Sequence, residues 1–237
     1  MKKFKNSLFI LALVLILCLQ TFITIFADAE IDLHAPDFNT PQKQTEIQEM
    51  NDIVNKYIEK SIKPNASDSK RLNVPLFQQE ETYYCGPASA KMVIHYIDGR
   101  SPSQSKLASN MDTNRQDGTI VWKLARELNK YAPYGYTNVS TSSFFSDLIY
   151  SIDRGQPVVC HVLANKLPHS RGANTSGHYV VATGYMWGFI GGNAEEYVYY
   201  NDPHYDNDYF GRYRCTSSDM EQAIRSRYGY YIRSTDK

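Results

Sequence analysis

The pattern of hydrophobic and polar positions changes at Gly155. The sequence before it favours four helical stretches, over 86–96, 103–110, 119–131 and 143–154. After it come runs rich in Val and Tyr, separated by Gly or Asp-Pro, and these predict strands over 158–164, 178–186, 196–202, 209–215 and 228–234. A further helix is expected over 217–227, ahead of the last strand. Helices followed by an antiparallel sheet predict an α+β fold.

A separate amphipathic helix is expected ahead of this region, over residues 41–62. Thr40 is a suitable N-cap, Pro41 fits the first helical position, and Pro64 ends the helix. Its apolar residues share one face at steps of three and four: Ile47, Met50, Ile53, Val54, Tyr57, Ile58 and Ile62. The polar stretch 63–71 is interpreted as a linker. Because the apolar face must be buried, we expect the helix either to dock permanently on the following domain or to cover its cleft as an intramolecular pro-segment.

The first 29 residues have the organisation of a secretory signal peptide. Three lysines among the first five residues precede an apolar run over 8–26, and small residues follow at Ala27 and Ala29. This pattern predicts cleavage after Ala29. The apolar run is also long enough to span a bilayer as an uncleaved anchor. In either case the rest of the chain is expected outside the cytoplasm, secreted or at the cell surface, and it would meet a membrane only through this segment.

The charge of the chain argues against a nucleic-acid-binding protein, and its length favours a single exported domain. The whole chain carries 25 basic and 25 acidic residues. Residues 1–29 hold three of the basic and one of the acidic residues, so the exported part has a small negative charge. This is unlike the basic surface of nucleic-acid-binding proteins, and no nucleic-acid partner is expected. The exported length suits one domain, over 72–237, preceded by the segment 30–71 with its helix and linker.

The stretch "YYCGPAS" places Cys85 at the start of a predicted helix. Signal cleavage leaves Cys85, Cys160 and Cys215, and an odd number of cysteines leaves at least one free thiol in an exported protein. The N-terminus of a helix has unpaired N–H groups and the positive end of the dipole, which stabilise a thiolate. Gly86 permits close approach of other groups, and Pro87 fits the first turn. Cys85 is therefore either a reactive nucleophile or a small buried apolar residue.

The other two cysteines leave two interpretations open. Cys160 and Cys215 both fall in predicted strands, and export permits a disulfide between them. A domain of this size also folds without a disulfide, in which case both are buried free cysteines.

A cysteine nucleophile needs a histidine partner, and His178 is the favoured candidate among six histidines. It follows Gly177 at the start of a strongly apolar predicted strand, so its side chain would open to a cleft while the strand fixes its backbone. His161 and His169 are also possible. The acceptor that orients the histidine is expected at Asp202, at the end of the next predicted strand.

Three stretches together resemble a known family: "VPLFQQEETYYCGPAS", "GHYVVATGY" and "YVYYNDP". They are similar to the papain-like cysteine peptidases of the bacteriocin-processing type, best known from domains that trim double-glycine leader peptides on export transporters and also found as stand-alone secreted relatives. The resemblance covers residues 72–234. It implies a papain-like fold, in which a helical half packs against a twisted antiparallel sheet.

The resemblance also implies roles for individual residues. Cys85 resembles the nucleophile, His178 the general acid/base and Asp202 the orienting residue. Gln79 matches the family's oxyanion-hole glutamine, and its neighbour Gln78 is the alternative. Position 84, where transporter-linked members often have an acidic residue, is a tyrosine here, which puts a double-glycine substrate in doubt.

The implied reaction is hydrolysis of a peptide bond, in a peptide or protein substrate, through an acyl-enzyme and without metal or organic cofactor. Two other functions remain open: a cell-wall amidase or transpeptidase of the same fold, and a catalytically silent module that binds peptides in the same cleft. The sequence contains two groups of possible metal ligands: Cys160, His161, His169 and His178 for zinc, and Asp202, Asp206 and Asp208 for calcium. Neither has the ligand spacing of a known metal site, so no metal is expected.

Overall fold

The computed structural model describes residues 45, 48, 49, 51, 52, 55, 67–140, 144–173, 177–190 and 193–236. The expected signal peptide or anchor lies outside these residues. Six positions of the expected helix 41–62 are described, at 45, 48, 49, 51, 52 and 55, and all six have helical conformation. Within the described part of the chain, no helix is both long and apolar enough to cross a membrane.

The helices and strands predicted from the sequence are present, with boundaries shifted by a few residues. The helices are α3 (Cys85–Asp98), α4 (Gln104–Asn110), α5 (Val121–Leu128), α6 (Phe144–Asp153) and α7 (Ser217–Arg225), with short 3-10 turns η1 (Ala164–Lys166) and η2 (Pro168–Ser170). The strands are β1 (Ser67–Arg71), β2 (Gly135–Ser140), β3 (Val158–Leu163), β4 (Gly177–Ile190), β5 (Asn193–Asp202), β6 (Gly211–Thr216) and β7 (Tyr230–Thr235). The predicted α+β class is therefore confirmed, although the strand β2, between α5 and α6, was not predicted.

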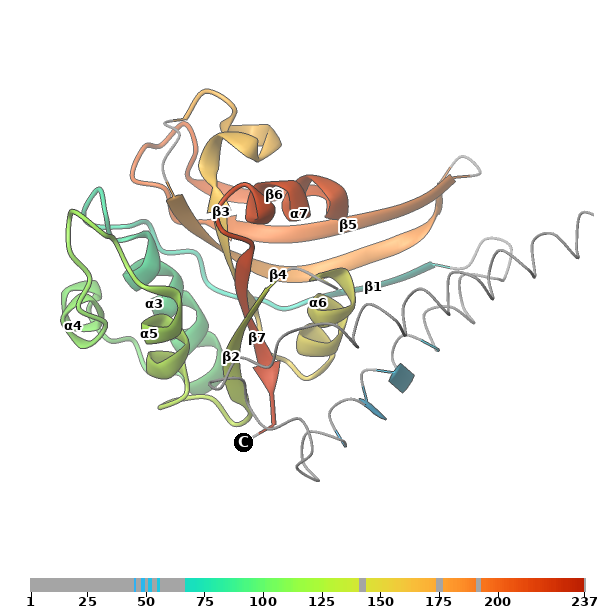
Figure 1. Ribbon diagram of the computed structural model, residues 1–237, viewed down its shortest axis with the longest axis horizontal. Helices are drawn as coiled ribbons and strands as arrows, with labels where there is room; N and C mark the ends of the chain where they lie inside the picture. Colours follow the sequence, from blue (N-terminus) through green and yellow to red (C-terminus); the bar gives the residue numbers. More distant parts are fainter. Residues whose placement is uncertain are drawn as a thin grey trace, which may run out of the picture. The chain divides into compact units, whose positions relative to one another are not determined.

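Local signals set the ends of several helices. Helix α3 ends at Gly99, whose φ of 76° lies in the left-handed region that favours glycine. Ser103 caps α4 by accepting a hydrogen bond from the Lys106 N–H, and Thr216 caps α7 by accepting one from the Asp219 N–H. Figure 1 shows α3, α4 and α5 grouped on one side of the strands, where α3 contacts β4 and α5 contacts β2.

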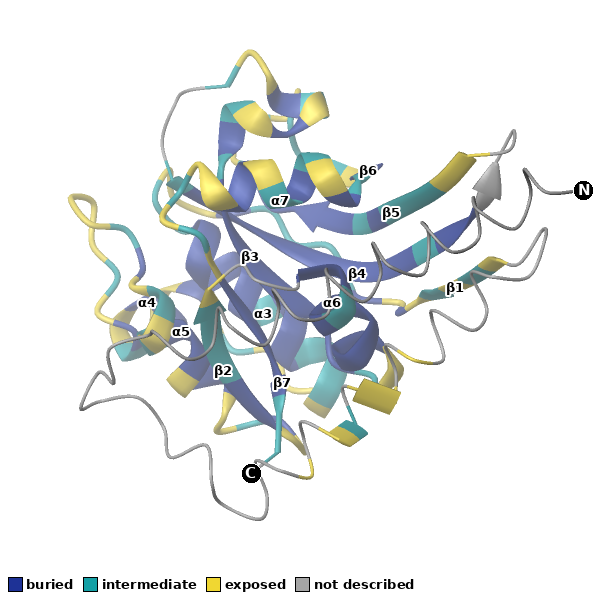
Figure 2. Ribbon diagram, turned by 45° about the vertical axis from the view of Figure 1, so that its right-hand side comes forward, coloured by how far each residue is buried: buried dark blue, intermediate teal, exposed yellow. Residues whose placement is uncertain are grey.

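The strands form one antiparallel sheet in the order β2-β7-β3-β4-β5-β6. Its centre is almost fully buried: every residue of β3 from Val158 to Val162 is buried, as is the start of β4 (Figure 2). In β3 and β4, Leu163 pairs with Gly177 and Val158 with Ala182. Strands β4 and β5 also pair antiparallel, with Ile190 opposite Asn193 and Val181 opposite Asn201. The end of β3, the start of β4 and the end of β5 therefore lie at the same edge of the sheet.

The interpretation of residues 63–71 as a linker is wrong for Ser67–Arg71. These residues form β1, which pairs antiparallel with Gly184–Gly188 of β4. Gly184 permits this close approach, because a Cβ at this position would lie 2.4 Å from the Lys70 carbonyl oxygen. The strand was missed because its side chains are polar and its pairing is made by backbone groups, which leave no hydrophobic signal in the sequence. The folded domain therefore includes β1.

Cys160 and Cys215 are free, and so is Cys85; all three are buried. Cys160 lies in β3 and Cys215 in β6, and strands β4 and β5 lie between them in the sheet. Strand spacing of about 4.8 Å puts their backbones about 14 Å apart across the sheet. A disulfide needs Cα atoms within about 7 Å. Of the two interpretations left open by the sequence, the structure supports two buried free cysteines.

Candidate active site

Cys85 is the first residue of α3 and is buried, with 8 % of its surface exposed. The preceding residue, Tyr84, provides no side-chain cap, so the first N–H groups of α3 are not used by a capping side chain. The positive end of the helix dipole therefore acts directly on the sulfur atom. This is the environment that the sequence predicted for a reactive thiol.

The start of α3 is fixed against β4 and the loop before α5. The Ser89 hydroxyl donates to the Tyr179 carbonyl oxygen (3.4 Å), and the Tyr179 hydroxyl donates to the carbonyl oxygen of Thr119 (2.7 Å). Thr119 packs so closely on Gly86 that a Cβ there would lie 2.2 Å from its Oγ1. A side chain at position 86, next to the thiol, would clash with Thr119, so this position requires glycine. Tyr179, which follows His178 in the chain, links the start of β4 to α3 and so keeps Cys85 close to His178.

His178 and Asp202 meet at the edge of the sheet where β4 begins and β5 ends. His178 Nε2 lies 2.7 Å from Asp202 Oδ1, and both side chains are buried. The Asp202 Oδ1 atom also accepts a hydrogen bond from the His204 backbone N–H (2.8 Å). The structure thus brings together Cys85, His178 and Asp202, the three residues singled out from the sequence.

The charges of this group favour a protonated His178. Burial alone lowers the pKa of His178, but the charge and hydrogen bond of Asp202, together with a hydrogen bond to Cys85, outweigh burial and raise its pKa to about 10. Burial raises the pKa of Asp202, but His178 and His169 more than offset this effect and hold that pKa well below its usual range. An imidazolium flanked by a carboxylate and a thiol is the arrangement that supports a thiolate nucleophile.

Gln79, and not Gln78, faces the thiol. Gln79 is buried (6 % exposed) and lines the same cavity as Cys85. Its Nε2 donates one N–H to the Glu81 carbonyl oxygen (2.8 Å), which leaves the second N–H of the amide for another acceptor. The Gln78 side chain instead donates to the Tyr205 carbonyl oxygen and to Asn207 Oδ1. The structure therefore selects Gln79 between the two neighbours.

A buried glutamine that the sequence did not reveal, Gln104, holds the backbone on both sides of Gln79. Gln104 Oε1 accepts a hydrogen bond from the Glu80 N–H (3.0 Å), and its Nε2 donates to the Gln78 carbonyl oxygen (2.7 Å). The Gln79 N–H donates to the carbonyl oxygen of Pro203, next to Asp202 (2.8 Å). Gln104 lies 26 residues from Gln78, and no local sequence signal connects the two.

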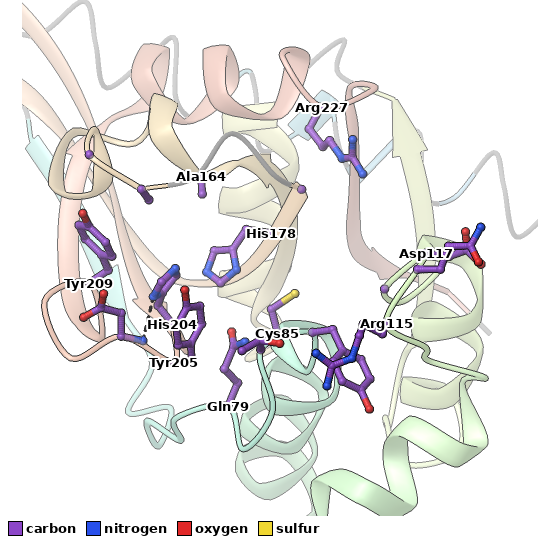
Figure 3. A pocket seen from close by; sticks show the side chains of 18 residues that line it. Gln79, Cys85, Arg115, Asp117, Ala164, His178, His204, Tyr205, Tyr209 and Arg227 are labelled. Carbon is purple, nitrogen blue, oxygen red and sulfur yellow. Dashed lines mark hydrogen bonds between the residues drawn. The ribbon is translucent and has the colours of Figure 1, made fainter.

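A cavity of about 420 Å³ opens over the thiol. Figure 3 shows Cys85, His178 and Gln79 at its centre, with His204, Tyr205 and Tyr209 toward one end and Arg115 and Arg227 toward the other. Both signs of charge line it, since Asp117 and Asp206 also contribute. The cavity is thus a polar cleft, large enough to accept several atoms of an extended chain.

Three of the other histidines also lie near the site, and one of them, His204, lines the cavity. His161 stacks on Tyr179 at 4.5 Å between ring centroids, and burial, followed by the charges of Arg227 and His178, lowers its pKa to about 4. It is therefore neutral at neutral pH. His169 contacts Asp202 directly, with Nε2 3.0 Å from Oδ2. Among the described residues, no cluster of three His, Cys, Asp or Glu side chains is arranged to hold a metal ion.

The chain is similar to known proteins both in sequence pattern and in fold. The model of the Peptidase_C39 like family matches residues 71–233. A C39-like peptidase from Bacillus anthracis has a similar structure, with a TM-score of 0.53, 21% sequence identity, and coverage of 72% of this chain and 98% of its own. Bromelain from Ananas comosus, solved with the inhibitor E64, has a TM-score of 0.50, 16% identity, and coverage of 71% and 99%. These likenesses confirm the predicted papain-like fold. No curated protein matches the chain.

Proposed function

The chain belongs to the Peptidase_C39 like family of cysteine-type peptidases, and we propose that it hydrolyses peptide bonds outside the cytoplasm through an acyl-enzyme formed on Cys85. The observation that carries the proposal is the placement of Cys85 at the start of α3, in one cavity with His178 and Gln79. The signal-like pattern of the first 29 residues supports the location.

Each residue of the site has a role in the proposed reaction. The Cys85 thiolate attacks the carbonyl carbon of the scissile bond, and the resulting oxyanion accepts hydrogen bonds from the Gln79 amide and the Cys85 backbone N–H. The His178 imidazolium then protonates the leaving amine as the C–N bond breaks. A water molecule, deprotonated by His178, attacks the thioester and releases the acid, which restores the thiolate and the imidazolium. Asp202 keeps His178 oriented and stabilises its positive charge throughout.

The proposal is tested with the exported chain, residues 30–237, and a library of peptides. Peptides cleaved by the wild type and left intact by Cys85→Ala, together with rapid alkylation of Cys85 by iodoacetamide at mildly acidic pH, are the expected results. Slow alkylation without cleavage would instead identify a silent peptide-binding module. Rapid alkylation with transfer of an acyl group to an added amine, and no hydrolysis, would identify a transpeptidase.

The raised pKa of His178 makes a prediction about the alkaline limit of activity. Because the imidazolium must protonate the leaving amine, kcat/KM should stay high until His178 loses its proton, at a pH near its pKa of about 10. Asp202→Asn removes the negative charge that raises this pKa, so the alkaline limb should move to lower pH. The measurement is kcat/KM against pH for both proteins. An alkaline limb that stays in place in Asp202→Asn would contradict the assignment of that limb to His178.

The segment before β1 is expected to stabilise the domain without blocking the cleft. Glu49 forms an ion pair with Arg154 (2.9 Å), which also pairs with Asp236 (2.6 Å). Arg154 lies just before β3, whereas the cavity lies at the other end of that strand, where Ala164 lines it. A chain that starts at Ser67, which keeps β1, should therefore show the alkylation rate of residues 30–237 and a lower Tm. Faster alkylation of the shorter chain would show that this segment is an inhibitory pro-segment.

A further inference from the structure

Asp202 is shared between two histidines, and the proposed reaction uses only one of them. Asp202 Oδ1 serves His178 and the His204 backbone N–H, while Oδ2 lies 3.0 Å from His169 Nε2. The carboxylate is fully buried, with 0 % of its surface exposed. His169 does not line the cavity over the thiol, so its contact with the site is made through Asp202.

His169 is itself held by two tyrosines from neighbouring strands. The Tyr200 hydroxyl, in β5, lies 2.8 Å from His169 Nδ1, and the ring of Tyr213, in β6, stacks on the imidazole with centroids 3.7 Å apart. Burial raises the pKa of Tyr200, so its hydroxyl keeps its proton and can donate. The Asp202 carboxylate, whose pKa is held low, only accepts hydrogen bonds, so His169 Nε2 donates to it, and the Tyr200 hydroxyl can then donate to Nδ1.

We propose that His169 is a positioning residue that fixes the Asp202 carboxylate, so that Oδ1 faces His178 and supports the thiolate–imidazolium pair. The inference rests on the proposed function and adds a fifth side chain to Cys85, His178, Asp202 and Gln79. Among the described residues, Asp202 Oδ2 accepts a hydrogen bond from His169 alone. Without this N–H it would be a buried acceptor with no partner. The charged carboxylate would then be less stable and free to turn about its Cβ–Cγ bond. A less stable or misdirected carboxylate supports the His178 imidazolium less, and the ion pair that makes Cys85 reactive is weakened.

The effect is measured on Cys85 itself, as the rate of alkylation by iodoacetamide between pH 4 and 9 in residues 30–237. The titratable or aromatic side chains of this cluster stay unchanged in every variant, except where a substitution at one of them is stated. They are Cys85, His178, Asp202, His204, Tyr200 and Tyr213. His169→Leu should lower the rate at pH 6 by about tenfold and move the midpoint of the profile up by about one pH unit. With a cleaved peptide, kcat should fall by a similar factor while KM changes less than about twofold, since His169 does not line the cavity.

Two further variants separate positioning from bulk. His169→Gln can place an amide N–H near the position of Nε2, and it should restore the alkylation rate to within about threefold of the wild type. Tyr200→Phe frees Nδ1 to take the ring proton, so it should shift the profile in the same direction as His169→Leu. Because Tyr200 acts through His169, the double variant should be no slower than His169→Leu alone.

A destabilised reference shows whether loss of stability is enough to slow alkylation. Thr216→Ala removes the cap of α7, away from Asp202, and should lower Tm while leaving the alkylation profile unchanged. If His169→Leu lowers Tm and keeps the wild-type alkylation profile, His169 is a structural residue and the inference is rejected. The proposed function fails separately, through rapid alkylation that persists in Cys85→Ala or through a wild-type Cys85 that alkylates slowly.

Discussion

Cys85→Ala is expected to abolish peptide hydrolysis. In the proposed reaction the Cys85 sulfur is the atom that is acylated, and Cys85 is the only cysteine among the described residues that line the cavity. Loss of the nucleophile from a hydrolytic triad costs about 10⁶-fold in kcat. His178→Ala should be comparably severe, because it removes both the partner of the thiolate and the acid that protonates the leaving amine. The measurement is the initial rate of cleavage of a peptide identified with the wild-type protein.

Cys160→Ala provides the matched control. Cys160 is fully buried in β3, burial raises the pKa of its thiol, and it does not line the cavity. This variant should keep hydrolysis near the wild-type rate, and mass spectrometry of the native wild type should show one rapidly alkylated cysteine. Wild-type hydrolysis in a folded Cys85→Ala protein would exclude the acyl-enzyme mechanism.

Gln79→Ala should lower kcat by about 10²–10³-fold, the usual cost of one oxyanion-hole donor. The Gln79 side chain lines the cavity, and Gln104 holds the backbone on either side of Gln79. The oxyanion exists only after the thiolate has attacked, so the loss should appear in kcat with little change in KM. Gln79→Glu has nearly the same shape but replaces the donor by a negative charge, and its loss should be at least as large.

Alkylation separates this role from damage to the site. Iodoacetamide reacts with the thiolate without forming an oxyanion, so Gln79→Ala should alkylate at close to the wild-type rate while its hydrolysis is slow. Gln78→Ala is the control, because the Gln78 side chain is directed to the Tyr205–Asn207 loop, and its kcat should stay within about threefold of the wild type. Equal losses of alkylation and hydrolysis in Gln79→Ala would show that Gln79 supports Cys85 and not the oxyanion.

The elements of the fold were largely predictable from the sequence because their signals are local. Periodicity, caps and the change of texture at Gly155 predicted the helices and the central strands. The environment of Cys85 was predictable for the same reason, since a residue at a helix start experiences the dipole of its own helix. His178 and Asp202 were also predictable from the sequence. His178 lies at the start of one strand and Asp202 at the end of the next, and antiparallel neighbours bring such ends together.

Other features depended on contacts between distant segments. Strand β1 pairs through its backbone with β4, and polar side chains conceal it in the sequence. The choice of Gln79 over Gln78 depends on contacts with distant residues, since the Gln78 side chain bonds to Tyr205 and Asn207 while Gln79 lines the cavity. His169 is 33 residues from Asp202, in a short turn without periodicity, and only the folded chain joins them.

The sequence by itself predicted the class of fold, because periodicity and turn residues are local signals. The resemblance of three stretches predicted the family, and a helix start and two strand ends pointed to Cys85, His178 and Asp202, which the structure brings together. The tertiary structure alone decided that Cys160 and Cys215 stay apart, that Gln79 faces the cleft, and that a second histidine shares Asp202. The physical reason is the same in each case. Sheet order and side-chain direction are set by which segments bury against one another, and a linear pattern of polar and apolar positions does not contain that information.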